Sequence, residues 1–261
     1  MKKLPPVALL CAGNLTDSSI TRFRGLAARL GPVKSSSLRL ASRFANILRA
    51  GYPVADYEAF RECPLVLVAV PDALAADAIR DLAGAGLDWP AVSVGLCSTA
   101  LESEELNLLA ELGARTTSIC EAAAVDGRWF VAEGDRDAIR HVRPIVEGPA
   151  RSEASRVVCL PRAQKKLYLA AVTCTGPLFT SLLKCAGECL KLAGVTGADA
   201  DAMLQTQAER TARSFLKGGR KLGQVPADLD RQVAALRSQN PDLAEFFEQS
   251  AKLTQWLSKQ E

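Results

Sequence analysis

The first residues with a recognisable chemical use lie in a short turn after an apolar run. Val7–Cys11 is continuously apolar, and the turn Ala12-Gly13-Asn14-Leu15 follows it directly. A glycine in such a turn lets the backbone approach a pyrophosphate, and Gly13 occupies the middle glycine position of the dinucleotide fingerprint. Cys11 and Thr16 stand where the other two glycines belong, so the loop alone is a weak motif. We expect dinucleotide contacts from Ala12, Gly13, Asn14 and Leu15.

Two further groups of residues follow predicted strands. Val70-Pro71 ends the most strand-like segment of the chain, and Ser98-Thr99 follows the next one. Ligands of open parallel sheets bind outside the carboxyl ends of the strands. We therefore expect a nicotinamide near Val70, Pro71 and Ser98. Ser98 and Thr99 are suited to binding a ribose or a substrate oxygen, and equally to capping the helix that follows.

The choice between two cofactors depends on residues after the second predicted strand. An acidic residue there would bind a ribose 2′-hydroxyl and repel a 2′-phosphate. This chain has Ser35-Ser36-Ser37, followed by Arg39 and Arg43. Hydroxyls and cations suit a phosphate, so Ser35 and Ser36 favour NADP over NAD. A polar turn in which Ser37 caps a helix explains the same residues.

Lys165 and Lys166 open a long helical pattern. A lysine there can act as a general acid or orient a carboxylate, and we expect Lys165 to be the catalytic residue. The alternative is a pair of solvated lysines at a helix end. The single histidine, His141, lies within a helical pattern, which we interpret as a surface position without a catalytic triad. We expect no metal site, because the chain lacks a second close cysteine pair beside Cys185 and Cys189.

Short apolar runs alternate with helical patterns up to about residue 160, which predicts βαβ units and a mostly parallel sheet. Helices are expected over residues 16–30, 38–50, 72–82, 102–112 and from 135. Strands are expected over 7–11, 33–35, 64–71, 92–96, 116–120, 129–133 and 157–160.

After Pro161 only helical patterns remain, over residues 163–193, 199–216, 227–236 and 243–257. We expect two domains, an α/β domain of residues 1–160 and an all-helical domain of residues 161–261. The first of these helices is apolar around most of its circumference, and a small domain covers such a helix only in part. We therefore expect a homodimer through the C-terminal helices.

Composition excludes several classes of protein. The chain has 261 residues, 48% of them hydrophobic, and a net charge of +3 from 32 basic and 29 acidic residues. This near-neutral balance, with 5% aromatic residues, does not indicate a nucleic-acid partner. No uninterrupted apolar run reaches the length of a membrane span, so we expect no membrane partner. The eight cysteines lie mostly in apolar segments, which is typical of thiols in a reducing cytoplasm.

Segments in the expected order resemble the Rossmann-like family related to pyrroline-5-carboxylate reductase, ketopantoate reductase and 6-phosphogluconate dehydrogenase. The resemblance is carried by Ala12-Gly13-Asn14, residues 65–72, 97–101, 130–135 and 165–171. It implies a Rossmann-type, doubly wound sheet that binds NAD(P), followed by an all-α domain of the 6-phosphogluconate dehydrogenase type, often dimerised through that domain.

The chain departs from this family at several polar positions. Thr99 stands where glycine is usual, Cys120-Glu121 where His-Pro is frequent, and Leu169 where histidine often occurs. Two functions therefore remain open. One is an NADP-dependent oxidoreductase acting on a small metabolite between the domains. The other is a non-catalytic descendant that binds another ligand or a protein partner.

Overall fold

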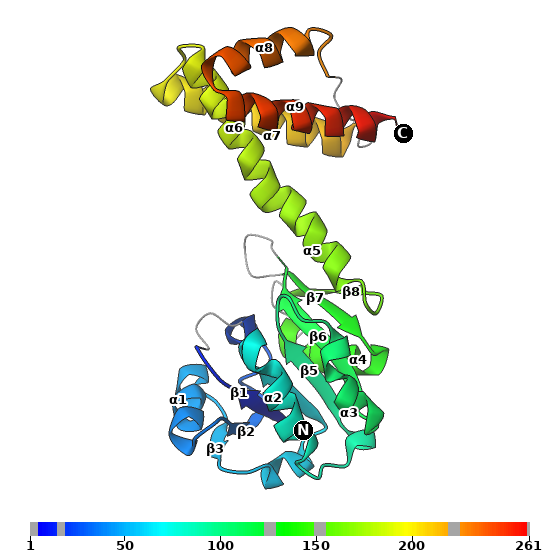
Figure 1. The fold of residues 1–261 in the computed structure, drawn as a ribbon. Helices are drawn as coiled ribbons and strands as arrows, with labels where there is room; N and C mark the ends of the chain where they lie inside the picture. Colours follow the sequence, from blue (N-terminus) through cyan, green and yellow to red (C-terminus); the bar gives the residue numbers. More distant parts are fainter. Residues whose placement is uncertain (1–4, 15–18, 123–128, 149–154, 219–224, 260–261) are drawn as a thin grey trace. The chain divides into compact units, whose positions relative to one another are not determined.

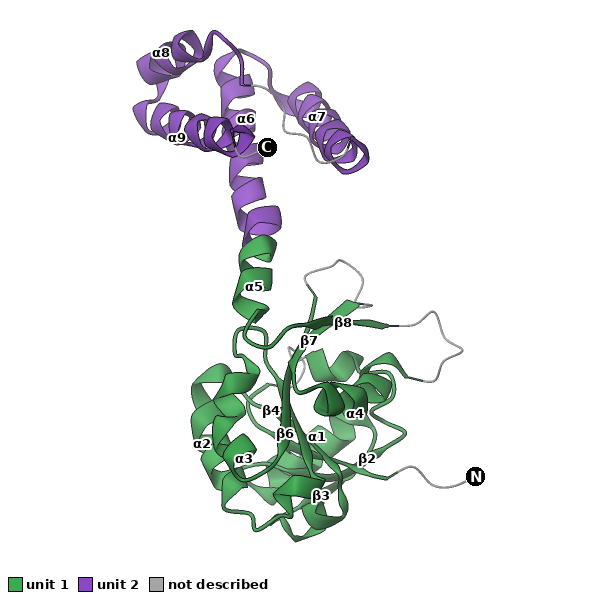
Figure 2. Ribbon diagram, turned by 90° about the vertical axis from the view of Figure 1, so that its right-hand side faces the viewer, with its two compact units in different colours: residues 1–172 green, residues 173–261 purple. Residues whose placement is uncertain are grey.

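The structure, a computed structural model, describes residues 5–14, 19–122, 129–148, 155–218 and 225–259. The chain divides into two compact units, unit 1 (Met1–Val172) and unit 2 (Thr173–Glu261), shown in green and purple in Figure 2. Unit 1 extends beyond the expected boundary at residue 160, because it includes the first helix after Pro161, α5 (Lys165–Thr173), up to Val172.

Unit 1 is built on a single sheet. Its strands are β1 (Val7–Cys11), β2 (Leu30–Lys34), β3 (Tyr52–Val54), β4 (Leu65–Ala69), β5 (Ser93–Cys97), β6 (Arg115–Glu121), β7 (Trp129–Gly134) and β8 (Arg156–Leu160). In the described part of the chain they form one eight-stranded sheet of order β3-β2-β1-β4-β5-β6-β7-β8 (Figure 1). All neighbours pair in parallel except β6 and β7. The predicted Rossmann-type class is confirmed.

Helices cover both faces of this sheet. They are α1 (Leu38–Leu48), α2 (Asp72–Ala83), α3 (Asn107–Glu111) and α4 (Arg136–Glu147), with 3-10 turns η2 (Ser19–Arg22), η3 (Glu58–Glu62), η4 (Trp89–Ala91) and η5 (Ser103–Leu106). Alternate residues of β1 enter different cores. Leu9 packs with α1 and α4 on one face, and Leu10 packs with α2 and α3 on the other. A strand covered on both faces must be apolar throughout, as this one is.

The helix expected over residues 16–30 is wrong. Among the described residues, this stretch contains the 3-10 turn η2 and then irregular turns. The backbone amides of Arg24 and Gly25 donate to the carbonyls of Val146 and Ile145 instead of to a preceding helical turn. An added Cβ at Gly25 would lie 2.3 Å from the Pro144 carbonyl oxygen, so glycine permits this close contact with the end of α4. Tertiary hydrogen bonds thus replace those of a helix.

A long helical run leads from unit 1 into unit 2. It consists of α5 (Lys165–Thr173), a π-helical turn η6 (Cys174–Leu178) and α6 (Phe179–Leu192). Gly176-Pro177 changes the hydrogen-bond pattern there without ending the run. By length and composition alone, the helix Lys165–Leu192 could cross a membrane, and an 18-residue window within it has a mean hydropathy of 1.3. The helix is not an uninterrupted apolar run, so the expectation from the sequence did not include it. A single such helix is weak evidence of a membrane span, because core helices pass the same test.

The described part of unit 2 is entirely helical, as expected. After α6 it contains α7 (Gly197–Lys217), α8 (Leu229–Gln239) and α9 (Pro241–Ser258). α7 packs against α6, and α8 packs against α9. Asn240 caps α9 by accepting a hydrogen bond from the Leu243 amide.

Candidate functional site

A pocket lies where three neighbouring strands of unit 1 end. β1, β4 and β5 are adjacent and parallel, so their carboxyl ends meet at one edge of the sheet. The pocket has a volume of about 210 Å³. Its lining residues come from the segments that follow these strands and from η2: Ala12, Asn14, Ser19, Ala69, Val70, Pro71, Asp72, Cys97, Ser98 and Thr99. The structure therefore brings together five residues predicted to bind the cofactor, namely Ala12, Asn14, Val70, Pro71 and Ser98.

Gly13 occupies the tip of the turn after β1 in a left-handed conformation, with φ +73°. A Cβ added there would lie 2.6 Å from Cγ of Pro71, which lines the pocket. The turn after β1 and the end of β4 are thus in close contact, and only a residue without a side chain fits both the conformation and the space. Leu15, the last predicted residue of this turn, lies outside the described residues.

The hydroxyl of Ser98 joins two walls of the pocket. Its Oγ donates to Oδ1 of Asp72 at 2.6 Å and accepts a hydrogen bond from the Leu101 amide at 2.9 Å. Asp72 is the first residue of α2, and Pro71 is its N-cap. Asp72 is exposed and Ser98 is buried, so the pair places one accessible carboxylate at the pocket.

Ser35 and Ser36 follow β2, beside the end of β1, and neither lines the pocket. Ser35 is 5% exposed, and its Oγ has no hydrogen-bond partner among the described residues. Ser36 is exposed, as are Arg39 and Arg43. Ser37 is the N-cap of α1 and accepts a hydrogen bond from the Leu40 amide, so the capping interpretation holds for that serine.

Sequence reasoning missed three residues of the pocket, which are Ser19, Asp72 and Cys97. Asp72 directly follows Pro71 and Cys97 directly precedes Ser98, so their position at the strand ends was an available signal. Thr99, a candidate together with Ser98, also lines the pocket. Ser19 had no local signal, because it belongs to the segment expected to be a regular helix.

The two lysines at the start of α5 differ completely in environment. Lys166 is exposed; its Nζ lies 3.0 Å from Oε2 of Glu102, as expected of a solvated lysine at a helix end. Lys165 is fully buried within unit 1. Its Nζ donates to the carbonyl oxygens of Ser98 and Leu101 and to Oγ of Ser118. Burial lowers the pKa of the Lys165 ammonium from its usual value.

The thiols near the pocket are poor nucleophiles. Burial raises the pKa of Cys97 to about 12, with a smaller opposing effect from the Lys165 charge. Burial also raises the pKa of Cys120 above its usual value. A protonated thiol is a weak nucleophile. Glu121 forms an ion pair with Arg22, so Cys120 and Glu121 have separate roles in packing and at the surface.

The residues present fit a dinucleotide in some respects and not in others. The positive φ of Gly13, the pocket beside it and the buried, unpartnered hydroxyl of Ser35 are features that such a ligand would use. A Rossmann site normally also offers the N-terminus of a helix to the pyrophosphate. In the part of the turn that the structure describes, only the 3-10 turn η2 follows β1. Backbone contacts at Gly13 would have to replace that helix.

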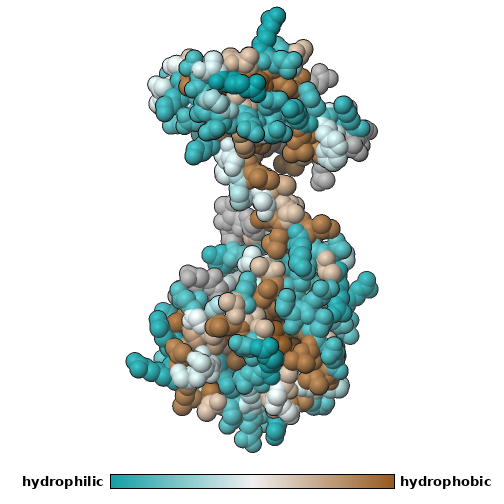
Figure 3. Space-filling model, in the orientation of Figure 1, coloured by the Kyte–Doolittle hydropathy of each residue, from teal (hydrophilic) through white to brown (hydrophobic). Residues whose placement is uncertain are grey.

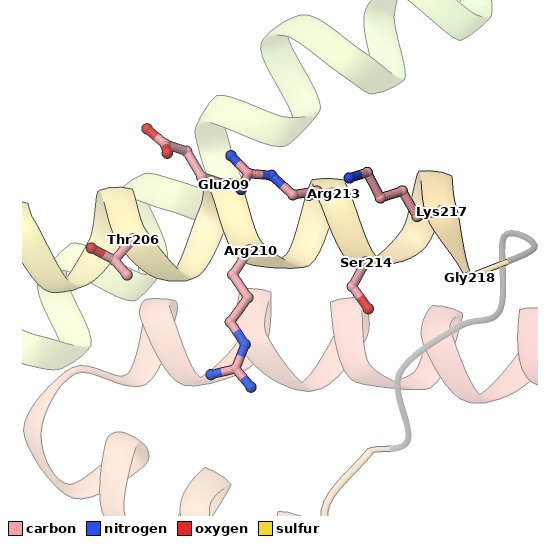
Figure 4. Close-up of a pocket in the computed structure, with 7 residues that line it drawn as sticks. All are labelled: Thr206, Glu209, Arg210, Arg213, Ser214, Lys217 and Gly218. Atoms are coloured by element: carbon pink, nitrogen blue, oxygen red, sulfur yellow. The ribbon is translucent and has the colours of Figure 1, made fainter.

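A second pocket, of about 570 Å³, lies on α7 in unit 2 (Figure 4). It is lined by Thr206, Glu209, Arg210, Arg213, Ser214, Lys217 and Gly218. Gly218 is the C-cap of α7, and Lys217 is in its last turn. Cations at a helix C-terminus interact favourably with the helix dipole, so this basic segment has a local explanation. These residues are all supplied by one helix and its cap.

Comparisons with known proteins identify the fold. No family model and no curated protein matches the chain. A candidate NADP oxidoreductase from Bacteroides fragilis has a TM-score of 0.71 at 16% identity, over 99% of each chain. Protein TM1727 from Thermotoga maritima has a TM-score of 0.66 at 16% identity, over 97% of this chain and 98% of the other.

An imine reductase from Myxococcus stipitatus, in complex with NADP+, is also similar. Its TM-score is 0.60 at 14% identity, over 98% of this chain and 92% of the other. These likenesses extend over both units and show that the chain has the fold of these proteins. At such low identity the fold alone is shown, and the specific families named from the sequence are not confirmed.

Proposed function

We propose that the chain is an NADP-dependent oxidoreductase that acts on a small metabolite. The observation that carries the proposal is the pocket at the ends of β1, β4 and β5, which gathers five of the residues expected to bind the cofactor. The names of the similar structures, an NADP oxidoreductase candidate and an imine reductase with NADP+, agree with this assignment.

Each part of the pocket has a proposed role. A bound nicotinamide would supply a hydride donor or acceptor. Ala12, Gly13 and Asn14 would approach the pyrophosphate with their backbone. Val70 and Pro71 would pack against the nicotinamide, and the Ser98 hydroxyl, oriented by Asp72, would bind a ribose or substrate oxygen. A direct catalytic role for Lys165 stays a prediction from the sequence.

Calorimetric titration with NADPH and NADH tests the proposal. We expect NADPH to bind more tightly than NADH. If neither cofactor binds at millimolar concentration, the oxidoreductase assignment fails and the non-catalytic alternative is favoured. Hydride transfer from NADPH to a carbonyl or imine compound in a substrate screen would exclude that alternative.

The preference for NADP is proposed from the turn after β2. No acidic residue occurs between Ser35 and Ala50, and the buried hydroxyl of Ser35 has no hydrogen-bond partner in the part of the chain that the structure describes. Ser36→Asp would place a carboxylate at an exposed position beside the expected 2′-phosphate. At separations near 4 Å in water, each charge pair contributes about 1 kcal/mol, so NADPH should bind roughly five- to thirty-fold more weakly. Ser36→Asn is the neutral control. Equal NADPH affinities of the two variants would contradict the placement.

We also propose a homodimer formed through unit 2 and the helical run before it. Large apolar side chains are exposed there, including Leu167 at 67%, Leu178 at 53% and Leu182 at 46%. Figure 3 shows hydrophobic residues, in brown, on the surface of this helical run. Unit 2 further contains an apolar groove of about 1420 Å³ lined mainly by α6, α7 and α9. Exposed apolar surface of this extent is typical of interfaces. Light scattering at micromolar concentration would contradict the dimer if it gave the mass of one chain.

We also propose that the protein is located in the cytoplasm. All eight cysteines are free, and five are buried. Free thiols are typical of proteins that remain in a reducing compartment.

A further inference from the structure

Lys165 is a buried cation whose hydrogen bonds all lead to neutral groups. It is 0% exposed, and its three ammonium hydrogens match three acceptors: two backbone carbonyls and the hydroxyl of Ser118, the latter at 2.8 Å. Among the described residues it forms no ion pair within 4 Å. Removing a charge from water without a charged partner is costly. We therefore ask which part of the structure the hydrogen bonds of this ammonium group hold in place.

The two carbonyls belong to one turn of the chain. Ser98 and Leu101 are its first and last residues, and the turn connects β5 to η5. Lys165 binds both carbonyl oxygens, and Ser118 on β6 also donates to the Leu101 carbonyl at 2.7 Å. Inside the turn, the Leu101 amide donates to the Ser98 hydroxyl. Hydrogen bonds therefore set the shape of the turn, and the ammonium group of Lys165 binds both of its ends.

This turn is also a wall of the pocket. Ser98 and Thr99 line it, and the Ser98 hydroxyl is directed to Asp72 on the opposite wall. Moving the Ser98 carbonyl would move the hydroxyl on the same residue. The ammonium group of Lys165 does not line the pocket itself. It influences the pocket through the turn, because its three hydrogens are bonded to Ser98, Leu101 and Ser118.

We propose that Lys165 is a positioning residue, whose buried ammonium holds the turn 98–101 in the shape that lines the pocket. The role in cofactor binding rests on the proposed function, whereas the effect on the turn does not. Five titratable groups interact with Lys165: Asp72 on α2, Cys97 on β5, Glu102 before η5, Cys120 on β6 and Glu133 on β7. Glu133 is itself buried and accepts hydrogen bonds from the amide and hydroxyl of Ser103.

The first test measures the turn itself. Lys165→Met keeps the length of the side chain and removes the charge and the donors. Lys166→Met is the matched control, because Lys166 is exposed and its ammonium group pairs with Glu102. Hydrogen exchange in the absence of cofactor should quicken at least ten-fold in peptides covering residues 98–103 of Lys165→Met. Peptides from β1 and β4 should exchange as in the wild type. Unchanged exchange in the turn, or equally faster exchange throughout unit 1, would overturn the proposal.

The second test measures the consequence for the pocket. NADPH should bind at least ten-fold more weakly to Lys165→Met than to the wild type, and equally well to Lys166→Met. Lys165→Arg, which keeps the charge and the donors, should recover part of the loss. A folded Lys165→Met with wild-type NADPH affinity would refute the positioning role. If the wild type binds neither cofactor, the proposed function fails, and the exchange experiment still decides the role of Lys165 in the turn.

A pH profile separates positioning from a purely structural role. The charged ammonium holds the turn, so wild-type NADPH affinity should fall as the pH rises through the lowered pKa of Lys165. Burial keeps the pKa of Cys97 at about 12, above this range. Lys165→Met should show no such step, and a step of the same size in the variant would contradict the proposal. If Lys165→Met does not fold, Ser118→Ala removes one of the three acceptors and should weaken NADPH binding at least three-fold, while unchanged affinity would overturn the proposal.

Discussion

Replacing Gly13 by alanine should destabilise the protein in two ways, through the backbone conformation of this residue and through a steric contact of the added Cβ. Gly13 has φ +73°, and an L-residue in this region costs about 1–2 kcal/mol. The added Cβ would also lie 2.6 Å from Cγ of Pro71. Relieving such a contact in a packed region costs about a further 1–3 kcal/mol. We therefore expect Gly13→Ala to lower the free energy of unfolding of unit 1 by about 2–5 kcal/mol.

Gly86 provides the matched control. Its φ of +64° is similar, and a Cβ added there would have nothing within 4 Å. Gly86→Ala should show only the conformational cost of about 1–2 kcal/mol. Urea unfolding measures both variants, and the difference between them isolates the contact with Pro71.

The same pair of variants tests the site. Relief of the contact requires the turn after β1 or the end of β4 to move, and both line the pocket. Gly13→Ala should bind NADPH at least ten-fold more weakly, and Gly86→Ala should bind it as the wild type does. The reasoning is refuted if the two variants lose equal stability and bind NADPH equally well.

Three other predictions depend on whether a residue is buried or exposed. Gly25→Ala should destabilise unit 1 by about 2–4 kcal/mol in urea, because its Cβ would lie 2.3 Å from the Pro144 carbonyl; a loss below 1 kcal/mol would contradict that contact. Glu133→Leu removes the acceptors of the buried Ser103 amide and hydroxyl and should cost about 1–3 kcal/mol by the same measurement, whereas a neutral effect would show that the carboxylate is not needed. In the folded protein, the exposed Cys159 should react with a water-soluble thiol reagent, whereas the buried Cys11, with its pKa raised to about 12, should not. Mass spectrometry identifies the modified peptides, and modification of Cys11 before Cys159 would contradict the prediction.

The main strands could be predicted because their signals are local. β4 is a run of apolar residues between Pro64 and Pro71, and the structure places this strand at Leu65–Ala69. β1 has the predicted bounds, Val7–Cys11. A strand buried on both faces must be apolar at every position, so a run of consecutive apolar residues predicts it.

Two elements of the same unit were wrong or missed because distant residues decide them. The apolar spacing of residues 16–30 indicates a helix, but the amides of Arg24 and Gly25 bind the end of α4 instead. The sequence predicts no strand at β3 (Tyr52–Val54), because Gly51 and Pro53, which follow the helix expected over residues 38–50, are typical signals for the end of a helix. Proline is tolerated at the edge of a sheet, where β3 pairs with β2 alone.

The position of the pocket was predictable for a topological reason. Parallel strands present their carboxyl ends at one edge, so residues after β1, β4 and β5 had to converge there. That rule places Gly13, Pro71 and Ser98 together. It does not say which hydroxyls are paired: Ser98 is bound to Asp72, while Ser35 is buried without a partner among the described residues.

Lys165 and Lys166 show most clearly what the sequence could not determine. By themselves they are two adjacent lysines at the start of a helix, a position that the sequence located correctly. Consecutive helical residues point about 100° apart, so one side chain can enter the protein while the other remains in water. Only the tertiary structure places the carbonyls of Ser98 and Leu101 and the hydroxyl of Ser118 around the first. Two acceptors from one turn and a third from β6 keep the buried ammonium hydrogen-bonded, and no local pattern in the sequence predicts that they meet there.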